Sequence, residues 1–323
     1  MSERVLVTGA GGFIGHHLVK YLKDKGYWVR GVDLKYPEYE STYADEFQIL
    51  DLRRFDNALI ATRNVKEVYH LAADMGGIGF ITAFHAEICR NDTMINVHTL
   101  EAARINGVDR FMYSSSACVY PQFLQSKPDV APLKEDDAWP ADPEAGYGLE
   151  KLFMEKMLEY YGEDYGLITR TCRFHNVYGP LGTYEGGREK APAAISRKIA
   201  LAKKEDTIEV WGDGEQTRSF MFIDDCIEGI FRIMRSEYKH PLNLGTDELI
   251  TINGLVDMIA EIADKKIAKK HDLSKPQGVR GRNSDNSRLR EVLGWEPKTP
   301  LRVGMKPTYE WIESELKNRN LIS

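Results

Sequence analysis

Three glycines near the amino terminus restrict the possible folds more than any other feature of the chain. Gly9, Gly12 and Gly15 follow a short apolar segment, Arg4–Thr8, and open a stretch with helical apolar periodicity. A second apolar segment, Trp28–Asp33, comes next and ends in an acid. This order predicts a strand, a glycine turn that can approach a pyrophosphate, a helix and a parallel second strand. The sequence therefore predicts an α/β fold that binds a dinucleotide.

Further apolar segments indicate how the rest of the chain is organised. Strands are predicted at 47–50, 67–71 and 110–114, with helical patterns between them. The alternation predicts a Rossmann-type, doubly wound parallel sheet with helices on both faces. Beyond residue 175 the alternation weakens, and a smaller, mixed α/β lobe that binds substrate is expected. The predicted cofactor domain is 1–175, rejoined by about 220–242, and the lobe comprises 176–219 and 243–323.

Within that lobe, local patterns predict individual elements. Helices are expected over 193–203, 252–264 and 303–317, and a helix over 223–235 is expected to rejoin the first domain. The basic run Lys265–Lys270 is interpreted as a solvated helix end without a function.

Residues at the predicted strand ends are placed to hold the cofactor. Asp33 would accept hydrogen bonds from the adenosine ribose and repel a 2′-phosphate, which favours NAD over NADP. Asp51 would meet the adenine. Taken alone, Ala72 and Ala73 are better explained by helix–strand packing. The predicted NAD contacts are Gly9, Gly12, Phe13, Ile14, Gly15, Asp33, Asp51, Leu71, Ala72, Ala73, Tyr147 and Lys151.

Composition narrows the classes of partner. The formal net charge of −6 speaks against a general nucleic-acid binder. No apolar run approaches membrane-spanning length and no signal peptide is recognisable, so we expect a cytoplasmic protein without a membrane partner. The four cysteines are widely spaced and form no C-x-x-C pair. We therefore predict neither a disulfide framework nor a metal site.

Tyr147 and Lys151 carry the chemistry that the glycine turn alone does not specify. They stand four residues apart in Y-G-L-E-K, which places them on one face of a helix. Tyrosine is a poor base near neutrality. The lysine ammonium and a positive nicotinamide would lower its pKa, so that it can take the proton of a substrate hydroxyl during hydride transfer. Ser115 or Ser116 would hydrogen-bond the same oxygen.

Together these motifs resemble the extended branch of the short-chain dehydrogenase/reductase superfamily, which modifies sugar nucleotides. The resemblance implies that the sugar's C4 hydroxyl is first oxidised to a ketone. It includes the motifs H-L-A-A, S-S-S, R-F-H-N-V-Y-G-P and W-G-D-G-E-Q-T-R-S-F. The 4,6-dehydratases of this branch carry a carboxylate beside the serine, whereas this chain continues with Ala117-Cys118. Cys118 is then either a proton shuttle beside an enolisable ketone or a small buried hydrophobe.

Three further segments favour the proton shuttle. They are G-G-R-E-K-A-P-A-A, D-M-G-G-I-G-F and G-V-R-G-R-N-S-D-N, and with S-S-A-C they resemble the GDP-mannose 3,5-epimerases over nearly the whole chain. That resemblance implies that Tyr147, Lys151 and Ser116 oxidise C4, and that Cys118 as base and Lys190 as acid invert C5 and C3. The rivals are a sugar-nucleotide 4-epimerase, with Cys118 and Lys190 merely structural, and a non-catalytic NAD-binding sensor or scaffold.

The same resemblance implies the substrate contacts and the assembly. GDP-mannose is the expected substrate and a homodimer the expected assembly. Lys198, Arg218 and Arg282 would anchor the diphosphate and nucleotide, because arginine forks match phosphate oxygens. His175 is interpreted as structural, and Asp224 and Asp225 as helix-capping acids. The predicted substrate contacts are Gly76, Ser115, Ser116, Cys118, Asn176, Glu189, Lys190, Ala191, Lys198, Gln216, Thr217, Arg218 and Arg282.

Overall fold

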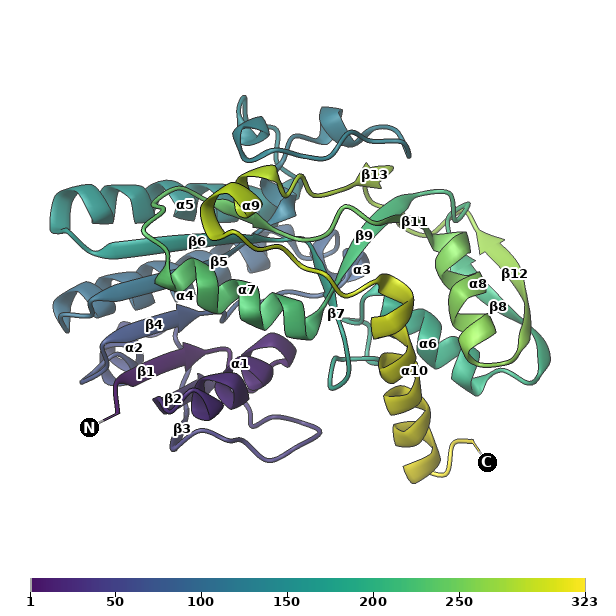
Figure 1. The fold of residues 1–323 in the computed structure, drawn as a ribbon, viewed down its shortest axis with the longest axis horizontal. Helices are drawn as coiled ribbons and strands as arrows, with labels where there is room; N and C mark the ends of the chain where they lie inside the picture. The colour runs from purple at the N-terminus through teal and green to yellow at the C-terminus, as the bar shows by residue number, and fades with distance from the viewer. Residues whose placement is uncertain (1, 323) are drawn as a thin grey trace.

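The main sheet of the protein is built from seven parallel strands. The computed structural model describes residues 2–322, and its main sheet has the order β10-β6-β5-β4-β1-β2-β3 (Figure 1). The order reverses between β1 and β4, where open sheets of this kind form a ligand crevice. The predicted Rossmann-type sheet is therefore confirmed. The strands are β1 Arg4–Thr8, β2 Trp28–Asp33, β3 Glu46–Ile49, β4 Glu67–His70, β5 Arg110–Ser116, β6 Ile168–Phe174 and β10 Leu242–Leu244.

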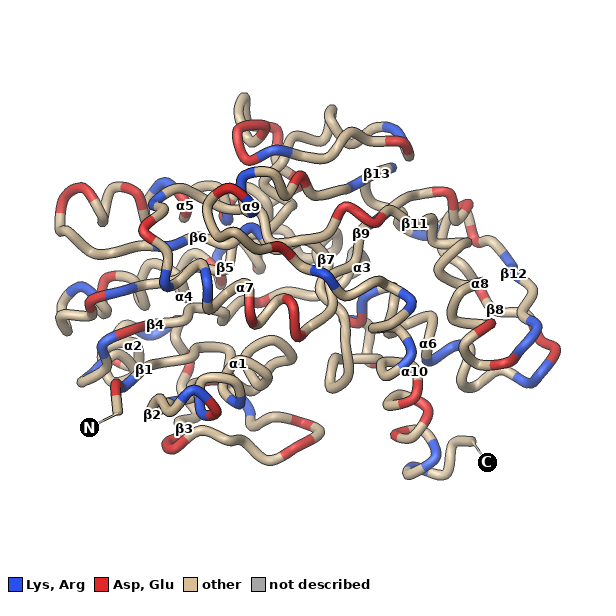
Figure 2. The backbone as a smooth tube through the Cα atoms, viewed as in Figure 1, with Lys and Arg blue, Asp and Glu red and all other residues tan. Residues whose placement is uncertain are grey.

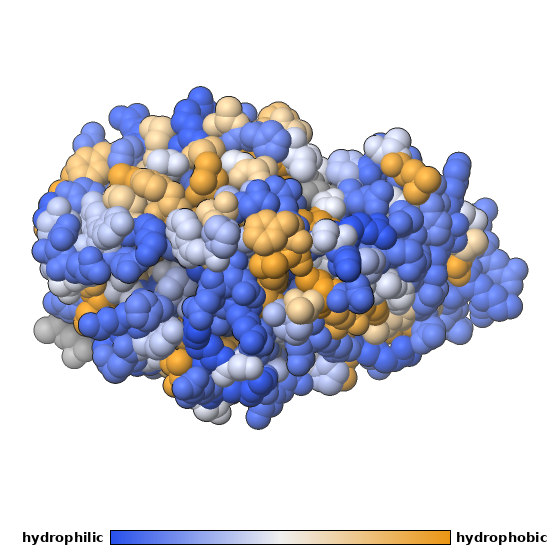
Figure 3. Space-filling view, turned by 90° about the horizontal axis from the view of Figure 1, so that it is seen from above, coloured by the Kyte–Doolittle hydropathy of each residue, from blue (hydrophilic) through white to orange (hydrophobic). Residues whose placement is uncertain are grey.

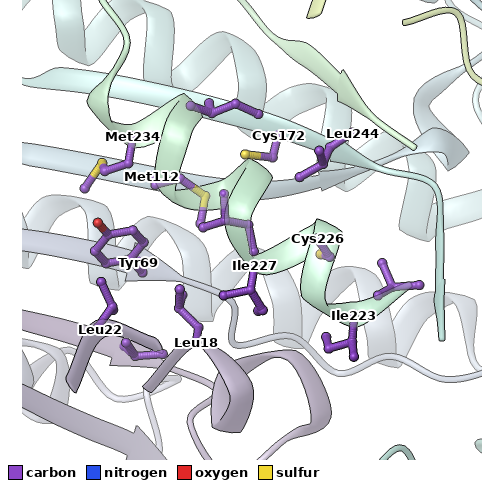
Figure 4. Close-up of a cluster of buried hydrophobic side chains, with 14 of the residues drawn as sticks. Leu18, Leu22, Tyr69, Met112, Cys172, Ile223, Cys226, Ile227, Met234 and Leu244 are labelled. Carbon is purple, nitrogen blue, oxygen red and sulfur yellow. The ribbon is translucent and has the colours of Figure 1, made fainter. Parts of the chain in front are cut away.

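Helices cover both faces of this sheet. α1 (Phe13–Asp24) and α7 (Ile223–Arg235) pack on one face, whereas α2 (Phe55–Ala61), α4 (His85–Ile105) and α5 (Ala145–Tyr165) pack on the other. Figure 4 shows side chains of α1 and α7 meeting those of β4, β5 and β6. α7 follows the helical period closely, because its buried residues recur every three or four positions. Each large apolar side chain buried there contributes roughly 1.5–3 kcal/mol.

A second lobe lies at the other end of the molecule. Its core is formed where α6 (Ala191–Leu201), α8 (Ile252–Ile262) and α10 (Leu301–Asn318) pack together beside a two-stranded parallel sheet, β8 (Glu205–Trp211) with β12 (Lys266–Asp272) (Figure 1). A small sheet joins this lobe to the first. Its strands are β7 Asn176–Tyr178, β9 Thr217–Phe222, β11 Leu249–Thr251 and β13 Gly281–Arg282.

Two sequence-based expectations about this half need correction. The basic run Lys265–Lys270 is not a helix end, since most of it lies in β12, where Lys266 pairs with Glu205 of β8. The few apolar residues of this run show neither helical nor strand periodicity. The conformation of the run is therefore determined by its pairing with the neighbouring strand. The division of the chain is also more interleaved than predicted. β10 is an edge strand of the main sheet, and α9 (Ser287–Leu293) packs on the same core through Leu289.

The surface carries both signs of charge. Acidic and basic residues are interspersed along both lobes (Figure 2). Figure 3 shows apolar patches separated by hydrophilic side chains on the face seen from above. Across residues 2–322, no helix is long and apolar enough to cross a membrane. Over the same residues, no group of three or more His, Cys, Asp or Glu could hold a metal ion.

Candidate functional site

The glycine turn leaves no room for side chains. Gly9 has a φ of +71°, and a Cβ atom there would lie 2.9 Å from the backbone nitrogen of Ala72. A Cβ atom at Gly15 would lie 2.0 Å from the carbonyl oxygen of Gly9. Gly12 is the N-cap of α1 and brings no capping side chain, so the first backbone N–H groups of the helix can receive an anion. This cradle fits the pyrophosphate of a dinucleotide.

A small cavity adjoins the glycine turn. It has a volume of about 70 Å³ and is lined by Gly12 and Phe13 together with Lys35, Tyr39 and Leu181. A larger cavity of about 780 Å³ is lined by Glu155, Arg173 and Arg288 among others, and its lining includes none of the predicted site residues. The volume of a cavity therefore does not identify the candidate site. The predicted residues at the carboxyl ends of the strands identify it instead.

The acids predicted to hold the adenosine lie at the expected strand ends. Asp33 closes β2 and accepts hydrogen bonds from the backbone N–H of Gly11 at 2.9 Å and of Leu34 at 2.6 Å. Its carboxylate is thus oriented beside the glycine turn. Asp51 follows β3 and forms an ion pair with Arg53 at 2.7 Å, which lowers the pKa of the acid. Its contact with the adenine stays a prediction.

The other predicted cofactor residues surround the end of β1. The backbone N–H groups of Leu71 and Ala72 donate to the Thr8 hydroxyl at 3.1 and 3.2 Å. This fixes the segment after β4 against the glycine turn. Ala73 continues the same segment, and Ile14 lies in the first turn of α1.

Tyr147, Lys151 and Ser116 are brought together at the carboxyl end of β5. The Lys151 ammonium is almost fully buried, donates to the carbonyl oxygen of Ser114 at 3.1 Å and lies 5.5 Å from the centre of the Tyr147 ring. The Ser116 hydroxyl accepts from the backbone N–H of Cys118 at 3.2 Å, and its interaction with the Tyr147 phenol lowers the pKa of that group. A substrate hydroxyl at this point would meet both a serine and a tyrosine.

The pKa of Tyr147 differs from the expectation. Burial raises it well above its ordinary value, and the nearby charges of Cys118 and Asp92 raise it further, whereas the hydrogen bond with Ser116 lowers it. The predicted lowering is therefore wrong for the protein groups taken together. A positive nicotinamide, the second part of that prediction, is the charge that could reverse the balance.

Ser115 does not belong to the site. Its hydroxyl donates to Glu155 at 2.5 Å, inside a buried network in which Glu155 also pairs with Arg173 at 2.7 Å. Successive side chains of a strand point to opposite faces, so Ser116 and Ser115 cannot both face Tyr147. The predicted substrate contact of Ser115 is wrong, and Ser116 is the serine that faces the tyrosine.

Cys118 sits beside this group in a short 3₁₀ turn. It is 7% exposed and packs in one cluster with Tyr147. Burial raises the pKa of its thiol, and Arg282, whose guanidinium lies 3.4 Å from the sulfur, lowers it. Lys190 is the N-cap residue of α6, and burial lowers the pKa of its ammonium while the charge of Cys118 raises it. Burial thus opposes formation of the thiolate and makes the ammonium a stronger acid.

Arg282 is held in place by three partners within the chain. Besides the contact with Cys118, it donates to Gln125 at 2.6 Å and forms a buried ion pair with Glu144 at 2.7 Å. These contacts place Arg282 against the thiol, and its contact with the diphosphate or nucleotide stays a prediction. Arg218 lies opposite Arg282 in the β9–β13 pair, and its guanidinium donates to the carbonyl oxygens of Thr217 and Gln277. Burial lowers the pKa of Arg218 to about 10.

The remaining predicted contacts are distributed around the joint between the lobes. Lys198 donates to the carbonyl oxygen of Glu209 at 2.7 Å, and Asn176 donates to that of Ser219 at 3.1 Å. Gln216 donates to the carbonyl oxygen of Trp211 at 3.3 Å. Their contacts with a substrate stay predictions. The Thr217 hydroxyl donates to the carbonyl oxygen of Pro128, and the Glu189 carboxylate accepts from the backbone N–H of Gly187. Ala191 is the first residue of α6, and Gly76 lies buried in the loop after β4.

Sequence reasoning missed several residues that complete this arrangement. Glu144 and Gln125 hold Arg282, although they lie 138 and 157 residues from it along the chain. Asp92 is a buried acid whose charge raises the pKa of Tyr147, while Lys151 lowers the pKa of Asp92 itself. No periodicity or motif marks these positions. His175 is buried against Asn243, in agreement with a structural role. Asp225 does not cap α7 but accepts the backbone N–H groups of Lys298 and Thr299.

Known proteins resemble this chain in sequence and in structure. A GDP-mannose 3,5-epimerase from Oryza sativa subsp. indica is 49% identical over 97% of this chain and 82% of its own length. One from Arabidopsis thaliana is 48% identical over 97% and 83%. A UDP-glucose 4-epimerase of Thermotoga maritima, solved with UDP-glucose, superposes with a TM-score of 0.86 at 28% identity, covering 97% of this chain and 99% of its own.

A second solved structure includes the cofactor. The UDP-glucose 4-epimerase of Thermus thermophilus in complex with NAD has a TM-score of 0.83 at 25% identity and covers 96% of this chain and 98% of its own. The family model described as the NAD dependent epimerase/dehydratase family matches residues 5–245. With the glycine cradle and the tyrosine–lysine–serine group already in place, the chain belongs to the NAD-dependent epimerase/dehydratase family.

Proposed function

We propose that this chain is a GDP-mannose 3,5-epimerase, which interconverts GDP-D-mannose and GDP-L-galactose and forms GDP-L-gulose when only C5 is inverted. The observation that carries the proposal is that Cys118 packs in one buried cluster with Tyr147 and donates its backbone N–H to the Ser116 hydroxyl at 3.2 Å. A sugar whose C4 oxygen binds at Ser116 therefore has its neighbouring carbons close to a thiol. Similarity to the two plant enzymes supports the choice of substrate.

The first set of residues opens the reaction. Tyr147 takes the proton of the C4 hydroxyl, and Ser116 holds the oxygen. The Lys151 side-chain nitrogen lies 5.5 Å from the centre of the Tyr147 ring, and a positive charge at that position favours the phenolate. NAD⁺ held at the glycine turn would accept the hydride from C4 and, as NADH, would return it to C4 after the inversion, so that no cofactor is consumed overall. The resulting ketone acidifies C3 and C5, because either carbanion is stabilised as an enolate.

The second set inverts the acidified carbons. Inversion requires a base on one face of the sugar and an acid on the other. Cys118 comes from the first lobe and Lys190 from the second, so they are suited to opposite faces. Arg282 beside the sulfur stabilises the thiolate that Cys118 needs as a base. Burial lowers the pKa of Lys190, which makes its ammonium a stronger acid.

Deuterium incorporation tests the proposal directly. In deuterium oxide with GDP-mannose, the protein should place deuterium at C3 and C5 of the recovered sugar nucleotide, measured by mass spectrometry and NMR. A 4-epimerase would leave both carbons unlabelled, and a sensor would leave the sugar unchanged. Either result contradicts the proposal.

Replacement of the Cys118 thiol distinguishes the oxidation of C4 from the inversion of C3 and C5. Cys118→Ala should keep C4 oxidation, because Tyr147, Lys151 and Ser116 remain, and should lose inversion by about a hundredfold to ten-thousandfold. Cys89→Ala is the matched control, since Cys89 is a partly buried free cysteine outside the site. Near-normal GDP-L-galactose formation by Cys118→Ala would show that the cysteine only packs.

We also propose that the protein forms a homodimer through α4 and α5. These two helices pack side by side and leave large apolar side chains in contact with solvent. On α5, Leu149 is 55%, Phe153 48% and Tyr160 52% exposed, and on α4, Met94 is 38% and Ile105 51% exposed. Apolar stripes on neighbouring helices favour burial against a second copy.

A further inference from the structure

Two loops from different lobes are joined beside the candidate site. The first loop follows β4, comprises residues 74–77 and continues into the short helix α3 (Ile78–Ile81). The second loop spans residues 186–190 and leads into α6. The backbone N–H of Gly77 donates to the carbonyl oxygen of Arg188 at 3.1 Å. The Arg188 guanidinium pairs with Asp74 at 3.1 Å and lies 3.9 Å from the centre of the Phe80 ring. Arg188 therefore contacts the first loop through its backbone and its charge, and the helix α3 through its planar face.

Asp74 is itself fixed by consecutive residues of α4. Its backbone N–H donates to Asp92 at 2.5 Å, and its carboxylate accepts from the Asn91 amide at 2.9 Å. α4 packs against α5, the helix that carries Tyr147 and Lys151. Asp74 is thus anchored to the helix layer that holds the oxidising residues, and Arg188 ties the second loop to that layer.

The second loop carries Lys190, only two residues beyond Arg188. Gly186 and Gly187 precede it with φ values of +90° and +84°, a conformation that glycine adopts readily. A Cβ atom at Gly77 would lie 2.5 Å from the carbonyl oxygen of Glu189, so the two backbones are in direct contact. With flexible glycines on one side and the start of α6 on the other, the contacts of Arg188 determine where Lys190 stands.

From these contacts we propose that Asp74 and Arg188 form a latch that positions Lys190 across the sugar from Cys118. The inference rests on the proposed function, in which Lys190 is the acid of the inversion. Both latch residues are positioning residues, since they act through Lys190. The oxidising residues stand on β5 and α5, outside the second loop. Loss of the latch should therefore impair inversion and leave C4 oxidation intact.

The expected size of the effect follows from the exposure of the pair. The Arg188 side chain is 50% exposed and that of Asp74 is 22% exposed. Exposed ion pairs and cation–π contacts are individually weak, so release of the latch should lower the rate of inversion by about tenfold rather than abolish it.

A double-mutant cycle tests the latch. Arg188→Ala and Asp74→Asn should each slow deuterium incorporation at C3 and C5 about tenfold, while substrate-driven NADH absorbance stays within about twofold of the unmodified protein. The double variant should be no slower than Arg188→Ala alone, because Arg188→Ala already removes the ion pair that Asp74→Asn breaks. Arg188→Lys, which keeps the charge but not the planar stack, should recover part of the rate.

Arg302→Ala is the matched control. Arg302 is a similarly exposed arginine, 57%, in an ion pair with Glu261 at 2.7 Å in the second lobe, and its loss should change neither readout. Normal inversion by Arg188→Ala would overturn the latch, and so would an equal loss of oxidation and inversion. Additive losses in the double variant would also overturn it. A lack of deuterium exchange by the unmodified protein would instead refute the proposed function itself.

Discussion

Asp92 carries a carboxyl group that the fold shuts off from solvent. The residue is 0% exposed. One oxygen accepts the backbone N–H of Asp74, and the other has no hydrogen-bond partner among residues 2–322. Burial raises the pKa of this acid to about 7, although the charge of Lys151 lowers it. Asp92 is therefore close to its titration midpoint at neutral pH.

This leads to a prediction on stability. Because the pKa of Asp92 is higher in the folded than in the unfolded chain, the folded state retains a proton between about pH 4 and pH 7 that the unfolded state releases. The contribution of the Asp92 carboxyl group to the free energy of unfolding thus falls as the pH rises through that window, by up to about 4 kcal/mol. Asp92→Asn removes the ionisation and should raise the melting temperature at pH 8 more than at pH 5.

Melting curves at both pH values check the prediction. Asp129→Asn, which changes an exposed acid, serves as the control and should shift the melting temperature little at either pH. A stabilisation by Asp92→Asn that is equal at pH 5 and pH 8 would contradict the titration.

For individual residues, the sequence predicts a role in the site when the interaction partner is close along the chain. Tyr147 and Lys151 share a helix face and Ser116 ends a strand, so their meeting could be predicted. Strand alternation also explains why Ser116 rather than Ser115 faces the tyrosine. Arg282 was identified as a cation, but its partner Glu144 is 138 residues away and its role beside Cys118 needed the three-dimensional arrangement.

Secondary-structure elements were predictable where their own pattern decides them. α7 begins and ends at the predicted residues because its apolar positions recur with the helical period. β12 was not predictable, since its residues are mostly polar and exposed and its conformation depends on pairing with β8. A local pattern determines the first element, and a neighbour in space determines the second.

The outer face of α5 carries the prediction at the scale of elements. If α4 and α5 form the dimer interface, Phe153→Glu places a charge in an apolar contact and should convert the dimer to a monomer. Analytical ultracentrifugation at several protein concentrations measures the change. Phe123→Glu is the control, because Phe123 is 55% exposed and lies outside both helices. A dimer that survives Phe153→Glu would place the interface elsewhere.

For the whole molecule, the cofactor should act as a stabilising ligand. A ligand that binds only the folded chain at a hundred times its dissociation constant stabilises it by about 2.7 kcal/mol. NAD should therefore raise the melting temperature, whereas NADP should do so far less, because Asp33 beside Gly11 repels a 2′-phosphate. Thermal shift measurements with both nucleotides, repeated for Asp33→Ser, check this. Equal shifts of the unmodified protein with NAD and NADP would refute the role of Asp33.

The interleaved path of the chain has a practical consequence for protein engineering. After entering the second lobe, the chain returns to the main sheet with α7 and β10, and again with α9. A fragment that stops at the end of the Rossmann-like half would lack Leu289, which completes the hydrophobic core of that half. Transplanting substrate preference between relatives therefore requires exchanging several separate segments together, because no single contiguous cassette contains the lobe.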